Sequence, residues 1–259
     1  MSGFRTLEVE RDGPIARVWL NRPERRNALD TEALEEIAAL FAGFARDFGT
    51  RVAVLGGRGA SFCAGADRKS PPGRERLAAG SGATDRERRH AAQLGLRAAR
   101  AVEDAEVVTI ARVHGHAIGG GAALALACDF RIAADDAVFQ IPEVDLGIPL
   151  AWGATARLAH EVGAARAREA ILLGDRFDAR TAERWGAVHR VVTAAELDAA
   201  VGDWARRLAA KPEIAVHMTK TQLRAYAALG RLGDFPESDG DALAIASRLG
   251  AARRAFGAD

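Results

Sequence analysis

A run of glycines near the middle of the chain is the stretch best suited to chemistry. Residues 107–113 form an apolar strand pattern, Gly119, Gly120 and Gly121 follow it, and an Ala/Leu-rich helix pattern then continues to Cys128. Glycines at a strand-to-helix junction let the backbone approach a ligand, and the free N–H groups there lie at the positive end of the helix dipole. The stretch therefore predicts a site for an anion or for an oxygen that becomes negatively charged.

The spacing of these glycines argues against a nucleotide site. Leu124 stands where a dinucleotide-binding Gly-x-Gly-x-x-Gly pattern would need its last glycine, and no Lys-Ser/Thr pair follows Gly120 as in a P-loop. An oxyanion hole is the other use of such a turn, in which each N–H donor contributes about 10²–10³ in rate. Residues 60–67 are mostly small and contain a glycine, so this segment could supply a second donor.

The elements that must position these segments can be predicted from periodicity and turn residues. Phe4–Glu10 and Ile15–Leu20 predict a β-hairpin. A helix capped by Asp30 or Thr31 should run to about Phe48, and a strand should follow at residues 52–55. Later segments are predicted as a loop at 56–82, a helix from about 85, strands at 130–133 and 188–192, and helices at 154–162, 164–173, 179–185, 195–210, 213–229 and 238–255.

Composition and charge exclude several classes of protein. The chain of 259 residues is 49% hydrophobic, and its 36 basic and 35 acidic side chains give a net charge of +1. This composition is typical of an ordinary globular protein and argues against disorder, a nucleic-acid partner or a membrane span. Cys63 and Cys128 are far apart and lack neighbouring ligands, so neither a disulfide nor a metal site is expected. A reducing, cytoplasmic location fits best.

Four motifs in order give the chain a family resemblance. They are Asn21–Leu29, Ser61–Asp67, Ile110–Phe130 and Pro142–Gly147. With them the chain resembles the enoyl-CoA hydratase/isomerase (crotonase) superfamily over essentially its whole length. The resemblance implies an α/β fold, a crotonase-like spiral of β-β-α units at residues 1–195 that carries the CoA-thioester site. It also implies a helical C-terminal oligomerisation region at residues 196–259, which would build a homotrimer or a dimer of trimers.

The resemblance also implies a set of site residues. The N–H groups of Ala66 and Gly120 would hold the thioester oxygen of an acyl-CoA, and Glu143 would act as acid and base at the substrate carbon. Coenzyme A belongs to the substrate, so neither a separate cofactor nor a metal is expected. The residues expected to contact the acyl-CoA are Arg22, Arg25, Ala64, Lys69 and Gly119.

The acid and base positions depart from the hydratase pattern. Hydratases of the superfamily typically carry two glutamates, but Ala123 stands at the first of these positions and only Glu143 remains. Hydration needs groups that both hold water and handle two proton positions, whereas one base can move a double bond by shuttling a proton. The single glutamate is similar to the pattern of enoyl-CoA isomerases. Dienoyl isomerases and dehalogenases use an aspartate where this chain has Ala151, which argues against those reactions.

Several alternatives remain open at the level of sequence. The chain could be a non-catalytic acyl-CoA-binding protein, or it could catalyse another crotonase reaction such as decarboxylation or C–C cleavage. His116 could replace the missing acid. Asp67 and Asp145 are expected to form structural hydrogen bonds, and Trp152 could shape the acyl pocket or belong to the core. The acyl chain length cannot be predicted.

Overall fold

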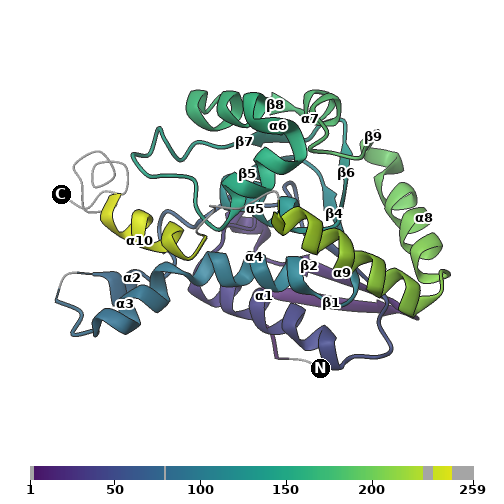
Figure 1. Cartoon of the computed structure of the whole chain (residues 1–259), viewed down its shortest axis with the longest axis horizontal. Helices are drawn as coiled ribbons and strands as arrows, with labels where there is room; N and C mark the ends of the chain where they lie inside the picture. Colours follow the sequence, from purple (N-terminus) through teal and green to yellow (C-terminus); the bar gives the residue numbers. More distant parts are fainter. Residues whose placement is uncertain (1–2, 79, 230–235, 247–259) are drawn as a thin grey trace.

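A six-stranded sheet forms the centre of the computed structural model, which describes residues 3–78, 80–229 and 236–246 (Figure 1). The strand order is β1-β2-β3-β4-β6-β9. β1 and β2 form the predicted antiparallel hairpin, and the remaining neighbours are parallel. The strands are β1 (Leu7–Asp12), β2 (Ile15–Leu20), β3 (Val52–Gly57), β4 (Val108–Val113), β6 (Phe130–Ala134) and β9 (Arg190–Val192).

Helices cover both faces of this sheet, as its buried parallel strands require. Every residue of β3 is buried, so this strand cannot face water on either side. One face packs against helices α1 (Thr31–Gly43), α4 (Leu94–Asp104) and α5 (Gly120–Ala127), and its core includes Phe41, Leu55 and Leu124. The other face packs against α8 (Leu197–Ala209) through a smaller core around Ile110 and Val201.

A second, three-stranded sheet was not predicted from the sequence. It consists of β5 (His116–Ile118), β7 (Val138–Gln140) and β8 (Phe177–Asp178). The chain leaves β4 for β5 at Gly115, which has φ +57°, and a Cβ atom there would lie 2.1 Å from the carbonyl oxygen of Ala60. Only glycine fits that close approach. This turn places the glycine run immediately beyond β5, at the end of the small sheet.

A short helix, α2 (Arg74–Leu77), lies within the segment 56–82 that was predicted as a loop, and the other remaining helices follow the predicted order with shifted boundaries. These others are α3 (Asp85–Ala92), α6 (Ala154–Leu173), α7 (Ala179–Trp185), α9 (Glu213–Leu229) and α10 (Pro236–Ala246), with short 3₁₀ turns η1 (Pro23–Arg25), η2 (Phe44–Arg46) and η3 (Ala194–Glu196). The first helix ends at Gly43, not at Phe48, because the chain tightens into η2. The two helices predicted at 154–162 and 164–173 join across a kink at Gly163, which has φ +76°. The predicted segment 247–255 lies outside the described residues.

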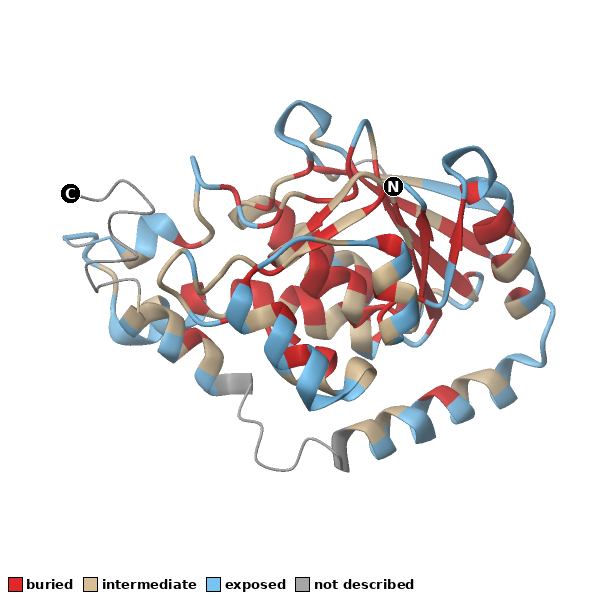
Figure 2. Cartoon of the chain, turned by 90° about the horizontal axis from the view of Figure 1, so that it is seen from above, coloured by how far each residue is buried: buried red, intermediate tan, exposed pale blue. Residues whose placement is uncertain are grey.

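The last helices extend over the outside of the molecule. Figure 2 shows that buried residues concentrate in the central sheet and the helices beside it, whereas α9, ahead of the grey connection, is mostly half-buried or exposed. No helix in the described ranges is long and apolar enough to cross a membrane. The division of the chain at residue 195 and the cytoplasmic location stay predictions.

Candidate active site

The two segments predicted to carry oxyanion donors lie side by side. The loop at Cys63 pairs with β5, since Cys63 N–H donates to the carbonyl of His116 at 2.8 Å and Ile118 N–H donates back to Cys63 at 3.0 Å. Gly65, at φ +88°, then passes so close to the glycine run that a Cβ atom would lie 2.7 Å from the Ile118 carbonyl oxygen and 3.5 Å from the Gly120 nitrogen. The fold therefore brings together the two segments that carry Ala66 and Gly120.

The backbone N–H groups of Ala66 and Gly120 are both available to a ligand. Leu29 holds the loop on either side of Ala66, donating to the Gly65 carbonyl and accepting from Asp67 N–H, each at 2.8 Å. Gly120 is the first residue of α5, where a backbone N–H has no intrahelical acceptor. Within the described part of the chain, neither N–H donates a hydrogen bond. Two such donors on neighbouring segments are suited to binding one carbonyl oxygen.

Glu143 places its carboxyl group beside this turn. A Cβ atom on Gly119 would lie 2.6 Å from Oε1 of Glu143, so glycine, at φ +50°, leaves the room that the carboxyl occupies. Oε2 of Glu143 is buried, and no hydrogen-bond partner exists for it among the described residues. Burial raises the pKa of Glu143 to about 7. A carboxyl with such a pKa can both take up and release a proton near neutral pH.

The structure gives the positions of two residues, Ala123 and Asp145, that the sequence analysis considered together with Glu143. Ala123, at the place where a second glutamate would stand, is 1% exposed on α5. Asp145 is exposed and lies over Gly174, where a Cβ atom would be 2.7 Å from Oδ2 of the aspartate. Glu143 is accordingly the acidic residue that the described structure places against the glycine run.

Asp67 holds the loop that carries Ala66, as predicted. Its Oδ1 accepts from the N–H groups of Lys69 and Ser70, and its Oδ2 accepts from Arg22 at 3.1 Å. Burial would raise the pKa of Asp67, but the hydrogen bonds from Lys69 and Ser70 and the guanidinium of Arg22 lower the pKa below its ordinary value. The aspartate therefore stays ionised and fixes the loop.

The residues predicted to contact coenzyme A are spread along the first loops. Arg22 is held by Asp30 at 2.9 Å and by Asp67, and only 17% of its side chain is exposed. Arg25 and Lys69 are exposed. The N–H of Ala64 donates to the Arg26 carbonyl at 2.9 Å. Their predicted role toward coenzyme A stays a prediction.

The two histidines near the site already have hydrogen-bond partners. His114 Nε2 bonds the Gly59 carbonyl at 2.8 Å, and His116 Nδ1 bonds Ser61 Oγ at 3.1 Å. Among the described residues, no three His, Cys, Asp or Glu side chains gather as metal ligands would. A role for His116 as an acid stays untested.

Trp152 lies against the glycine run, a position that sequence reasoning left open. A Cβ atom on Gly120 would meet the six-membered part of the indole at 2.3 Å, and a Cβ atom on Gly95 would meet the ring at 1.8 Å. The residue is 9% exposed and has φ +63°, a left-handed backbone that is uncommon for a bulky side chain. The only signal for this contact in the sequence was the presence of a tryptophan in the loop that follows Pro142 and Glu143.

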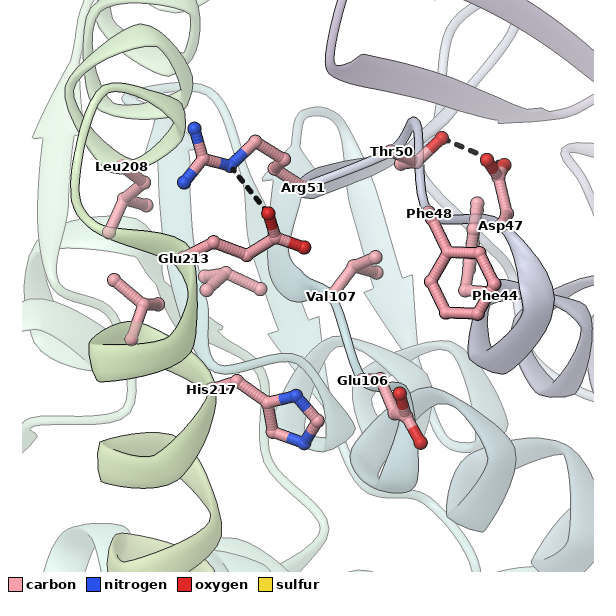
Figure 3. Close-up of a pocket in the computed structure, with 12 residues that line it drawn as sticks. Phe44, Asp47, Phe48, Thr50, Arg51, Glu106, Val107, Leu208, Glu213 and His217 are labelled. Carbon is pink, nitrogen blue, oxygen red and sulfur yellow. Dashed lines mark hydrogen bonds and ion pairs between the residues drawn. The ribbon is translucent and has the colours of Figure 1, made fainter.

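Two hollows lie away from Glu143. Figure 3 shows one where α9 meets the end of α1 and the start of β4; within it Arg51 faces Glu213 at 3.9 Å, and Phe48 is exposed. The other, of about 460 Å³, lies between the central sheet and α8 and is lined by Trp19 and Arg58. None of Glu143, Ala66 and Gly120 lines either hollow.

Comparisons with known proteins agree with the fold and the order of motifs. The family model described as enoyl-CoA hydratase/isomerase matches residues 10–234. A crotonyl-CoA hydratase of Syntrophomonas wolfei is 35% identical over 218 residues, which cover 84% of this chain and 80% of the relative. A carnitinyl-CoA dehydratase of Citrobacter koseri is 36% identical over 221 residues, covering 85% and 80%.

A solved structure extends the similarity to the C-terminal helices. A crystal structure of an enoyl-CoA hydratase from Mycobacterium avium subsp. paratuberculosis superposes with a TM-score of 0.86 and 27% identity, covering 99% of this chain and 96% of that one. The expected crotonase fold is thereby confirmed. With a family model that spans most of its length and relatives at about 35% identity, this chain belongs to the enoyl-CoA hydratase/isomerase family.

Proposed function

We propose that the chain binds an acyl-CoA thioester through the N–H groups of Ala66 and Gly120 and moves a proton on the acyl chain with Glu143. The observation that carries this proposal is the buried Oε2 of Glu143, which has no hydrogen-bond partner among the described residues and lies beside the turn that carries the Gly120 N–H. Two hydrogen bonds to the thioester oxygen would make the α-carbon more acidic, and a base with a pKa of about 7 suits removal of that proton.

Isomerisation of an enoyl-CoA is the reaction that one glutamate can complete. The carboxylate of Glu143 takes the proton from the α-carbon of a 3-enoyl thioester, and the double bond moves from the β,γ to the α,β position. The resulting carboxylic acid then returns the proton to the γ-carbon. One group accepts and donates the same proton, so the absence of a second acid at Ala123 is no obstacle.

Hydration is the second candidate, and the relatives favour it. Those at about 35% identity include a crotonyl-CoA hydratase and a short-chain-enoyl-CoA hydratase. For this reaction Glu143 would activate water for attack on the β-carbon of a 2-enoyl thioester, and the proton taken from the water would go to the α-carbon. With Ala123 unable to hold the water, Glu143 would have to do so alone.

Products of matched substrates separate the candidates. Purified protein is given 2-enoyl-CoA and 3-enoyl-CoA esters of equal chain length, with Glu143→Gln in parallel, and the products are resolved by chromatography and mass spectrometry. Conversion of the 3-enoyl ester without a change in mass, lost in the variant, supports isomerisation. A gain of one water by the 2-enoyl ester supports hydration. Binding of both esters without turnover would instead indicate an acyl-CoA-binding protein.

The proposal includes an oligomer of three copies, or two such trimers, built through the C-terminal helices. Its support is the outer side of α9, where large apolar side chains face solvent: Ile214, Met218, Leu223 and Tyr226 are 59–72% exposed. Light scattering should give the mass of three or six chains, and a Leu223→Glu, Tyr226→Glu double variant should lower that mass. A monomer for the unmodified chain would contradict this part of the proposal.

A further inference from the structure

Trp152 is wedged between two helices at the proposed acyl site. The positions of hypothetical Cβ atoms show which backbone the indole touches. One part of the ring lies against Gly95 on α4, and the other part lies against Gly120 on α5. Neither position could carry even an alanine without moving the ring. The two glycines therefore fit the indole between the helices, and the ring cannot shift toward either of them.

The backbone of Trp152 is also fixed. Trp152 and Gly153 both have positive φ, +63° and +68°. The carbonyl of Trp152 accepts from Nη1 of Arg157 at 2.7 Å, and Arg157 is itself paired with Glu103 at 2.6 Å. Asp239 of α10 accepts the Gly153 N–H at 2.8 Å. Surrounding contacts that hold a bulky residue in this conformation suggest that the ring must stay in place.

The proposed chemistry places the acyl chain beside this ring. Glu143 contacts Gly119, and the indole covers Gly120, the next residue along the chain. A thioester oxygen bonded to the Gly120 N–H lies about 3 Å from that nitrogen, so the first acyl carbons must pass within contact distance of the same turn. The indole is then a large, rigid side chain that touches this turn.

We infer that Trp152 is a specificity-determining residue that closes the acyl site and restricts this protein to short acyl thioesters. The inference rests on the proposed function, because it takes the oxyanion contact at Gly120 as its starting point. A long chain would have to displace a ring that two helices and the backbone contacts hold in place. A short enoyl group could lie flat against the indole without moving it.

The test compares chain lengths in wild-type protein and three variants. Binding of saturated butanoyl-, octanoyl- and dodecanoyl-CoA is measured by calorimetry, and turnover of the corresponding enoyl esters is measured separately. Trp152→Ala opens the site, and Trp152→Phe keeps a flat ring. Trp185→Ala, on α7, is the matched control, since Trp185 packs against Phe177 away from the glycine run.

We expect wild-type protein to favour the butanoyl ester, and Trp152→Ala to shift the ratio of affinities toward the dodecanoyl ester by more than about tenfold. Trp152→Phe should keep the preference for the short ester, which also covers the case in which the alanine variant folds poorly. The inference is overturned if wild-type protein binds long esters as tightly as short ones, or if Trp185→Ala shifts the ratio equally. The binding series does not need catalysis, so a failure of turnover alone would count against the proposed chemistry and leave this inference standing.

Discussion

Two partly buried carboxylates in this molecule have opposite surroundings. Asp129, at the end of α5, accepts from Nζ of Lys220 at 2.7 Å and from the N–H and hydroxyl of Thr109 at 2.7 and 2.9 Å. Glu143, at the other end of that helix, has a buried oxygen with no hydrogen-bond partner in the part of the chain that the structure describes. A buried arginine is paired in the same way, since Arg131 contacts Glu161 at 2.5 Å.

The difference separates structural charges from the one that we propose to be functional. A buried charge without a partner is costly, so proteins usually pair such groups or neutralise them. The contacts of Asp129 hold α9 on the core, and removing one of them should cost stability. Glu143 forms no comparable ion pair among the described residues, and burial raises its pKa to about 7. Perturbed groups of this kind cluster at functional sites.

Replacement of Glu143, the proposed proton-transfer group, should have the largest effect on activity. Glu143→Gln keeps the size of the side chain but cannot accept a proton at its former carboxylate. We expect kcat/KM on the preferred enoyl-CoA to fall by about 10³-fold or more, as for a general base in other enzymes. Steady-state kinetics with purified variant and wild type measure this loss.

Asp145→Asn is the matched control for that variant. Asp145 is exposed two residues away and lies over Gly174, so its neutralisation should leave activity close to that of wild type. If both variants lost activity equally, the loss would come from the loop as a whole, and the assignment of Glu143 as the base would be wrong.

Breaking the ion pair between Lys220 and Asp129 should instead lower the stability of the fold. Lys220→Met leaves Asp129 with its hydrogen bonds from Thr109 but without a cation, and only 8% of the Lys220 side chain is exposed. We expect the free energy of unfolding to fall by about 3 kcal/mol or more, measured by denaturant titration. Adding Asp129→Asn should recover part of the loss, because it removes the stranded charge.

An exposed ion pair provides the reference for this experiment. Arg207 and Asp203 pair on the surface of α8 with side chains 69% and 50% exposed. Arg207→Met should change stability by less than about 1 kcal/mol. Similar losses for Lys220→Met and Arg207→Met would mean that burial gives the Lys220 pair no special role.

The same glutamine variant should stabilise the fold at alkaline pH. The pKa of Glu143 is about 7 in the folded chain, against an ordinary value of 4.5, so the folded state binds the proton more tightly. The stability that the neutral carboxyl provides is complete below pH 4.5 and is lost as pH rises through about 7. Glu143→Gln has no carboxyl to ionise, and above pH 8 it should be more stable than wild type by up to about 3 kcal/mol.

Thermal or denaturant unfolding at several pH values measures this difference. The stabilities of wild type and variant should converge below pH 5, diverge as the pH rises from about 5 to about 7, and stay apart above pH 7. A constant difference at every pH would mean that Glu143 titrates normally and that its burial does not perturb its pKa. The activity of wild type should rise with pH through the same region, because the base must be ionised to accept a proton.

Periodicity and glycine spacing predicted much of the fold and the centre of the site. The hairpin, the first helix and the helix after the glycine run all rest on local pattern, and local contacts decide such elements. The loop of Ala66 and the turn of Gly120 could be brought together because small residues in both allow close backbone contact. The family resemblance then singled out Glu143, which a lone Pro-Glu sequence could not have done.

The remaining features depend on contacts between distant parts of the chain. β5, β7 and β8 have two or three residues each, too few for a periodic pattern, and long-range pairing defines them. The wedge of Trp152 requires glycines 32 and 57 residues earlier in the sequence, at Gly120 and Gly95. Lys220 could not be matched to Asp129 across 91 residues from sequence alone.

Substitutions at the proposed surface contacts with coenzyme A should have the smallest effect on kinetics. They compare an exposed lysine with an arginine that is held in ion pairs. Lys69 is exposed, whereas Arg22 is held by Asp30 and Asp67. We expect Lys69→Ala to raise KM for a CoA thioester by about twofold to fivefold, as for other exposed ion pairs, with kcat unchanged. The matching pantetheine thioester lacks the nucleotide and its phosphates, so its KM should not respond.

Arg22→Met should lower kcat for both esters, because its loss frees the loop that carries Ala66. A KM increase for Arg22→Met confined to the CoA ester would show that Arg22 binds phosphate instead.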